Sequence, residues 1–113
     1  MPFLVVMSKS MEPTLKPGDL LIVEGPDLHV PCIGDIIVFR SKMSKILIVH
    51  RVVKVDYKDS QTVILTKGDA LMNVDERLTL NEVLGIVRWR APKLAVFPYI
   101  LRKTAEKRHN LSL

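Results

Sequence analysis

The chain has 113 residues, of which 48% are hydrophobic and 26% charged, and this balance excludes a disordered or collagen-like protein. Its length predicts one compact domain, residues 1–113, with a single modest core. The formal net charge of +5 is uneven, because residues 1–87 hold 10 Lys and Arg against 11 Asp and Glu, whereas residues 88–113 hold 7 against Glu106 alone. The basic character therefore belongs to a C-terminal segment from about residue 91 to residue 113.

Five short apolar runs, rich in Val and Ile and bounded by Gly, Pro or Asp, are typical of β-strands. They are Leu20–Val23, Ile36–Phe39, Ile46–Val55, Thr62–Thr66 and Val83–Trp89. No segment has a sustained apolar stripe at helical spacing, and only Asp75–Leu84 is compatible with a short helical turn. The sequence therefore predicts a mainly β fold.

Gly-Asp pairs stand at the ends of predicted strands, at Gly18-Asp19, Gly34-Asp35 and Gly68-Asp69. Glycine adopts backbone angles that are closed to other residues, and an Asp side chain accepts hydrogen bonds from nearby backbone amides. We therefore interpret Asp19 and Asp35 as turn residues.

The run Ile46–Val53 is apolar on both faces of a strand except at His50 and Arg51. Successive side chains of a strand point to opposite faces, so these two polar side chains lie on different faces. At least one of them needs a polar partner within the fold.

A possible catalytic set includes Ser10, which lies in a polar loop before the first predicted strand. A serine hydroxyl is a weak nucleophile unless a positioned base takes its proton, and a neutral imidazole such as that of His50 suits this task. A carboxylate would fix the tautomer of the imidazole, and both Asp69 and Asp75 are candidates.

Other reactive side chains are expected to play no part. The single cysteine, Cys32, excludes an internal disulfide, and the three histidines lack the spacing of a zinc site. His29 lies in a Pro-flanked loop and His109 in the basic tail, so we interpret both as bystanders. We expect neither a metal nor a cofactor.

Four sequence blocks follow one another along the chain: Ser10-Met11-Glu12-Pro13-Thr14-Leu15 with Pro17-Gly18-Asp19, then Gly34-Asp35-Ile36-Ile37, then His50-Arg51-Val52-Val53, then Lys67-Gly68-Asp69 with Asp75. In this order they resemble type I signal peptidase. They cover roughly residues 8–90, and the first block is the most specific. Bacterial members generally have a lysine base where this chain has His50, so the resemblance is to the archaeal and endoplasmic-reticulum branch with a Ser-His-Asp arrangement. The chain departs from the family at Ala70-Leu71, where two Asn often follow the Asp.

The resemblance implies roles for the candidate residues. Ser10 is the expected nucleophile, His50 the general base and Asp75 the third member, chosen over Asp69 by family spacing. Asp69 is then a supporting acidic residue of the catalytic site.

Two further roles concern the neighbours of the serine. Ser8 lies two residues before Ser10, as does a serine in some bacterial members whose hydroxyl joins the backbone N–H of the nucleophile in the oxyanion hole. We therefore expect Ser8 and the Ser10 N–H to form this hole, although a solvated loop serine fits equally well. Met11 is the first candidate for substrate contact, and core packing is an equal alternative.

The resemblance also implies a small, largely antiparallel β fold and a membrane-associated serine endopeptidase. Its expected substrates are secretory preproteins, cut on the extracytoplasmic side of a membrane after small residues at positions −1 and −3. Family members usually carry an N-terminal membrane anchor before the serine motif, whereas only nine residues precede Ser10 here. We therefore expect a catalytic domain whose anchor is absent from this chain; the sequence names no partner subunit.

Two alternatives remain open at the level of the sequence. One is a self-cleaving Ser-Lys protease of the repressor type, with Lys45 or Lys54 as the base. The other is a non-catalytic β module that binds peptides or anionic surfaces. The apolar segment Ala91–Leu101 between basic residues fits either a membrane surface or packing on the sheet, and no nucleic-acid partner is expected.

Overall fold

The computed structural model describes residues 3–25 and 30–92. Its strands form a single seven-stranded sheet in the order β1-β2-β7-β3-β4-β5-β6, and every neighbouring pair is antiparallel. The strands are β1 (Phe3–Val5), β2 (Leu20–Glu24), β3 (Ile36–Arg40), β4 (Leu47–Lys58), β5 (Gln61–Lys67), β6 (Leu78–Thr79) and β7 (Val83–Ala91). The predicted mainly β, largely antiparallel fold is confirmed. His29, His109 and nearly all of the basic C-terminal segment lie outside the described residues.

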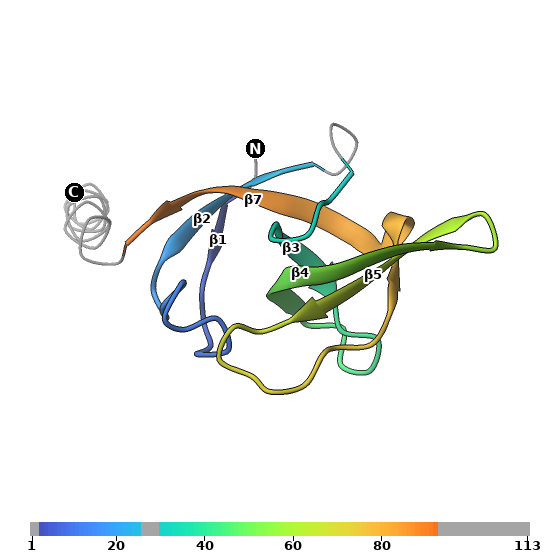
Figure 1. Cartoon of the computed structure of the whole chain (residues 1–113). Coiled ribbons are helices and arrows are strands. Elements are labelled where there is room, and N and C mark those ends of the chain that lie inside the picture. The colour runs from blue at the N-terminus through green and yellow to red at the C-terminus, as the bar shows by residue number, and fades with distance from the viewer. Residues whose placement is uncertain (1–2, 26–29, 93–113) are drawn as a thin grey trace, which may run out of the picture.

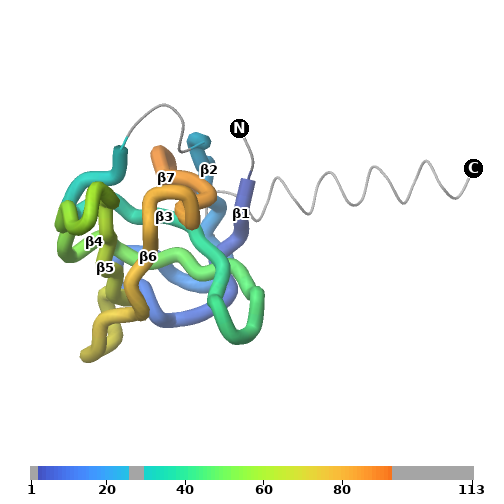
Figure 2. The backbone as a smooth tube through the Cα atoms, turned by 90° about the vertical axis from the view of Figure 1, so that its right-hand side faces the viewer, coloured from blue at the N-terminus to red at the C-terminus, as the bar shows by residue number. Residues whose placement is uncertain are grey.

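The sheet is strongly curved. Figure 1 shows β7 passing over the top of the molecule between β1 and β2 on one side and β4 and β5 on the other. The tube in Figure 2, seen from the side, shows the same separation, with β3 and β7 between the two groups. This curvature brings loops from both ends of the sheet together below it.

All five predicted strands are present, and each ends one to three residues beyond its predicted run. Two strands were missed: β1 and β6 have three and two residues, too few for a pattern, and exist through pairing with β2 and β5. The predicted helical turn is confirmed as a 3-10 helix, η2 (Leu80–Glu82), which begins with a capping box in which Glu82 Oε1 accepts the Thr79 N–H at 3.0 Å.

The core has two parts, one on each face of β3. Ile37 and Phe39 belong to one cluster of buried side chains, while Val38 belongs to the other. Because side chains alternate along a strand, β3 must be apolar throughout to serve both clusters. The first cluster also contains Val52, Ile64, Leu78, Val83 and Ile86, and the second contains Val6, Met11, Leu15, Leu21 and Val23.

The predicted turn roles of Asp19 and Asp35 are confirmed. Asp19 Oδ2 accepts the Lys16 N–H at 2.9 Å, and Asp35 Oδ2 accepts the Cys32 N–H at 2.8 Å. The glycines before them have φ angles of 94° and 98°, in the left-handed region that favours glycine. The described ranges hold no helix with the length and apolar character needed to cross a membrane.

Candidate active site

Three segments distant in sequence meet below the sheet. Ser10 lies in the loop between β1 and β2, His50 on β4, and Asp69 and Asp75 on the connection from β5 to β6. The first of these loops is closed by hydrogen bonds from the Val6 N–H to Asp19 O and from the Gly18 N–H to Val6 O. Figure 1 shows this loop, in blue, beside the yellow connection after β5.

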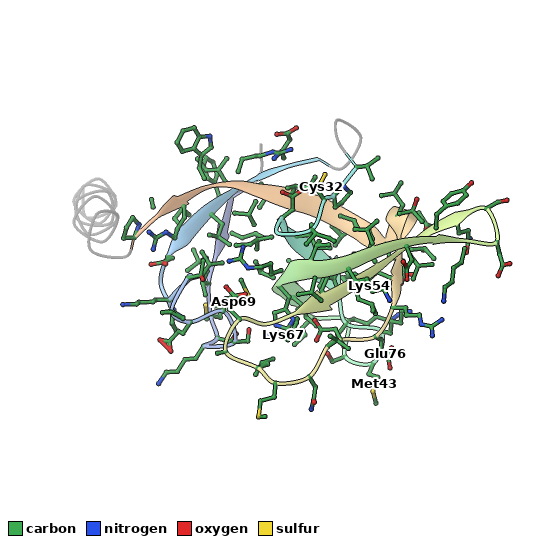
Figure 3. The ribbon with its side chains drawn as sticks, in the orientation of Figure 1. Cys32, Met43, Lys54, Lys67, Asp69 and Glu76 are labelled. Carbon is green, nitrogen blue, oxygen red and sulfur yellow. The ribbon has the colours of Figure 1, made fainter. Side chains whose placement is uncertain are left out.

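The two loops are joined next to the serine itself. The Ala70 N–H donates to Ser10 O at 2.9 Å, and Lys67 Nζ donates to Gly68 O and Leu71 O at 2.9 and 2.7 Å. Figure 3 shows Lys67 and Asp69 together at this lower edge of the sheet. The position of the serine backbone therefore depends on the connection after β5.

His50 links a hydroxyl to a carboxylate. Its Nε2 lies 3.1 Å from Ser10 Oγ, and its Nδ1 lies 2.5 Å from Asp75 Oδ2. Only 6% of His50 is exposed, and its ring meets that of Phe39 edge to face at a centroid distance of 6.2 Å. When Nδ1–H donates a hydrogen bond to the carboxylate, the lone pair of Nε2 faces the hydroxyl, which is the tautomer that a general base requires.

The Asp75 carboxylate is itself held by β5. Thr66 Oγ1 donates to Asp75 Oδ2 at 2.7 Å, and the Asp75 N–H donates to Thr66 O at 2.7 Å. Asp75 therefore has fixed partners on two strands, His50 on β4 and Thr66 on β5.

Asp69 has other partners. Arg51 donates to both of its oxygens, from Nε at 2.9 Å and from Nη2 at 2.8 Å, and Thr14 Oγ1 donates to Oδ2 at 2.6 Å. The hydrogen bonds from Arg51 lower the pKa of Asp69 below its usual value, and the same contact raises the pKa of Arg51. Arg51 Nη1 also donates to Gly34 O at 2.9 Å. Both polar side chains within the apolar part of β4 thus have partners, His50 on one face and Arg51 on the other.

Ser8 lies beside the candidate nucleophile. Its Oγ is 3.1 Å from Ser10 Oγ and accepts the Ser10 N–H at 3.4 Å. The Ser8 hydroxyl and the Ser10 N–H are therefore two polar groups next to the position that an attacked carbonyl would occupy.

Gly68 is a site residue for which the sequence indicated no separate role, although it stood in a Gly-Asp pair and in the fourth block of the resemblance. A Cβ at this position would lie 2.6 Å from Ser10 O and 3.0 Å from His50 Nε2, closer than van der Waals contact. The absence of a side chain is what allows the connection after β5 to reach the serine. The signal in the sequence was the Gly-Asp pair at the end of a predicted strand.

An apolar cavity of about 660 Å³ opens onto the serine and the histidine. One side is formed by β1 and the loop that follows it, and the other by residues Ile46–His50 at the start of β4. Met11 lines this cavity, but only 2% of it is exposed, and it packs in the second core cluster while its Sδ accepts the Asp69 N–H at 3.3 Å. The remaining lining residues are Leu4, Val5, Val6, Met7, Ser8, Ser10 and Leu15.

The lysines that a Ser-Lys mechanism would need have other surroundings. Lys54 Nζ lies 3.4 Å from Asp56 Oδ2, and Figure 3 shows Lys54 on β4 away from Asp69. Lys45 is exposed in the turn between β3 and β4. Over residues 3–25 and 30–92, no three His, Cys, Asp or Glu side chains form a group that could hold a metal ion.

Residues 1–83 match the family model of signal peptidase, peptidase S26. The signal peptidase complex catalytic subunit SEC11 of Komagataella phaffii is 38% identical over 109 residues, covering 82% of this chain and 62% of the relative. The corresponding subunit of Schizosaccharomyces pombe is 33% identical over 128 residues, covering 88% and 63%. That of Candida albicans is 41% identical over 68 residues, covering 60% and 40%.

The chain thus spans between 40% and 63% of the length of these three relatives. The family match covers well over half of the chain and includes Ser10, His50 and Asp75. The chain therefore belongs to the peptidase S26 family of signal peptidases.

Proposed function

We propose that this chain is a serine endopeptidase that removes signal peptides from secretory preproteins, with Ser10, His50 and Asp75 as its catalytic residues. The observation that carries the proposal is the hydrogen-bonded series Ser10 Oγ, His50 and Asp75 Oδ2 at the mouth of an apolar cavity. Membership of the signal peptidase family supports the choice of substrate class.

The reaction begins with attack of Ser10 Oγ on the carbonyl carbon of the scissile bond, while His50 Nε2 takes the hydroxyl proton. The resulting imidazolium is stabilised by Asp75, which accepts its Nδ1–H. His50 then gives the proton to the departing amine as the C–N bond breaks. In the second half of the reaction His50 takes a proton from water, the hydroxide attacks the acyl ester, and the proton returns to Ser10 Oγ.

The negative oxygen of each tetrahedral intermediate needs hydrogen-bond donors. The Ser10 N–H and the Ser8 hydroxyl lie beside the attacking atom, and we assign both to the oxyanion hole. In the free protein the Ser10 N–H donates to Ser8 Oγ. When substrate binds, this hydrogen bond is broken and both groups donate to the substrate oxygen instead.

The cavity binds the residues that precede the cleavage site. β1 is one of the two edge strands of the sheet and borders the cavity, so an extended peptide can pair with it through main-chain hydrogen bonds. Alternate side chains of that peptide then point into the cavity, whose lining is mostly apolar.

The relatives are named catalytic subunits of a signal peptidase complex, and on this basis we assign the chain to a membrane-associated complex as well. Because preproteins are cut as they leave the cytoplasm, we place the catalytic site on the extracytoplasmic side. A basic C-terminal segment fits contact with anionic headgroups.

The test is cleavage of a model signal peptide with small residues at −1 and −3 by the wild type and by Ser10→Ala. We expect a folded but inactive Ser10→Ala protein, because loss of a loop hydroxyl removes the attacking atom without creating a large cavity. His50→Ala should also be inactive, whereas Lys45→Ala and Lys54→Ala should cleave at the wild-type rate.

Other outcomes point to the alternatives. An inactive lysine variant beside an active His50→Ala protein would favour a Ser-Lys protease. A wild type that neither cleaves the peptide nor reacts with a serine-directed acylating probe would favour a binding module.

A further inference from the structure

We infer that Thr66 is a positioning residue that holds the Asp75 carboxylate against His50. The inference rests on the proposed function, since it concerns the same catalytic series. The Thr66 hydroxyl is bound to Asp75, and Thr66 is not among the residues that line the cavity, so it acts through Asp75.

The first observation is the environment of the Thr66 side chain. Thr66 is 0% exposed on β5, where its neighbour across the ladder is Val52. A buried hydroxyl is unfavourable unless it is hydrogen-bonded, and a valine has almost the same shape without this requirement. The hydroxyl therefore needs a partner, and that partner is the Asp75 carboxylate at 2.7 Å.

The second observation is which carboxylate oxygen is bound. Thr66 Oγ1 donates to Oδ2 of Asp75, the same oxygen that lies 2.5 Å from His50 Nδ1. An ionised carboxylate only accepts hydrogen bonds, so two donors converging on one oxygen fix the rotation of the carboxyl group about its Cβ–Cγ bond. The carboxylate plane is thus oriented from β5, not from the imidazole alone.

The third observation is the lack of regular structure around Asp75. Asp75 lies in the connection between β5 and β6, outside any strand, yet its N–H donates to Thr66 O at 2.7 Å. The backbone of Thr66 thus fixes the position of Asp75, while its hydroxyl fixes the orientation of the carboxylate. Because β5 pairs with β4, which carries His50, both partners of Asp75 lie on neighbouring strands of the sheet.

The test compares Thr66→Val, Thr66→Ser and Thr66→Ala with the wild type in kcat, KM and thermal unfolding. Thr66→Val keeps the volume and removes the donor, so we expect kcat to fall by about 10- to 100-fold with KM nearly unchanged. Thr66→Ser keeps the donor and loses a methyl group, so it should retain most of kcat while unfolding at a lower temperature. Thr66→Ala should show the same decrease in kcat as Thr66→Val. It replaces the valine variant in the comparison if that variant does not fold.

The matched control is Thr62→Val, the same substitution on the same strand away from Asp75. It should leave kcat unchanged. A purely structural role of Thr66 predicts the reverse order, in which the valine variant is active and the serine variant, being less stable, is the weaker enzyme.

A second readout does not depend on cleavage. We expect the Nδ1 proton of His50, hydrogen-bonded to Asp75, to give a proton NMR signal far downfield. Thr66→Val should shift or broaden this signal, while Thr66→Ser and Thr62→Val should leave it in place. If the wild type fails to cleave any signal peptide, the proposed function fails, but this signal still decides whether Thr66 orients Asp75. A signal that Thr66→Val leaves unchanged would overturn the inference, and so would a wild-type kcat in that variant.

Discussion

Asp69 and Asp75 lie on the same connection, only six residues apart, but their carboxylates contact different groups. Asp75 Oδ2 is 2.5 Å from the imidazole of His50, whereas Asp69 accepts two hydrogen bonds from the guanidinium of Arg51. A carboxylate on an imidazole orients the ring and stabilises its charged form, while a carboxylate on a guanidinium supports local structure. Substitution of the two residues should therefore change different properties of the protein.

We expect Asp75→Asn to lower kcat on a model signal peptide by about 10⁴-fold with a small change in stability, because Asn favours the wrong tautomer of His50. Asp69→Asn should mainly lower the free energy of unfolding, by about 1 to 3 kcal/mol, because Arg51 loses its charged acceptor. Steady-state kinetics and urea unfolding at neutral pH measure the two effects. Full activity of Asp75→Asn beside a folded, inactive Asp69→Asn protein would exchange the two roles.

At the scale of elements, the end of β5 lies against the segments that carry two of the proposed catalytic residues. Gly68 follows β5 directly and lies against the backbone of Ser10 and the ring of His50. The serine loop, β4 and the connection after β5 therefore share one contact point. The close approach of these three segments depends on the absence of a side chain at Gly68.

We expect Gly68→Ala to lower kcat by about 100-fold. The added Cβ would lie 2.6 Å from Ser10 O and 3.0 Å from His50 Nε2, so one of these groups has to move. A displacement of about 1 Å is enough to misalign a catalytic site. Gly25→Ala is the matched control, since a Cβ there meets no atom within 4 Å. Cleavage rates and thermal unfolding of both variants check this expectation. A Gly68→Ala enzyme as active as the Gly25→Ala enzyme would contradict it.

At the scale of the whole molecule, Arg51 joins three surface segments to the sheet. From β4 it binds Asp69 after β5 and Gly34 O before β3, and Thr14 of the serine loop donates to the same Asp69 carboxylate. Loops that connect distant parts of the sheet are thus held by one group of charged side chains. This arrangement makes the stability of the fold depend on the ionisation of Asp69.

The pKa of Asp69 in the folded protein is lower than its usual value of 3.8, chiefly because Arg51 donates hydrogen bonds to it. A carboxyl group with a lowered pKa stabilises the folded state above its unfolded pKa, and this contribution is lost as the pH falls through the folded pKa. We therefore expect the difference in unfolding free energy between the wild type and Asp69→Asn to be constant near neutral pH and to shrink below about pH 4.

Urea unfolding of both proteins from pH 7 down to pH 2 tests this expectation. Both proteins lose stability through their other carboxylates, so only the difference between them reports on Asp69. A difference that stays constant or grows as the pH falls would show that the charge of Asp69 does not stabilise the fold.

The strands of this protein were largely predictable from its sequence. Runs of β-branched residues bounded by Gly, Pro and Asp identified five of them, because such runs fit a pleated and buried surface. The strands β1 and β6 were not predictable, since so short a strand is stable only when a neighbour supplies its hydrogen bonds. Their positions became apparent only with the pairing of the whole sheet.

The candidate site was also predictable only in part from the sequence. The sequence by itself determined which side chains can carry the chemistry: a loop serine, a histidine inside an apolar strand and two acids on one connection. The tertiary structure decided which acid meets the histidine, and it showed the otherwise ordinary strand residue Thr66 beside Asp75. Contacts between residues 25 or 40 positions apart depend on the curvature of the sheet and the closing of its loops, which no local pattern of residues encodes.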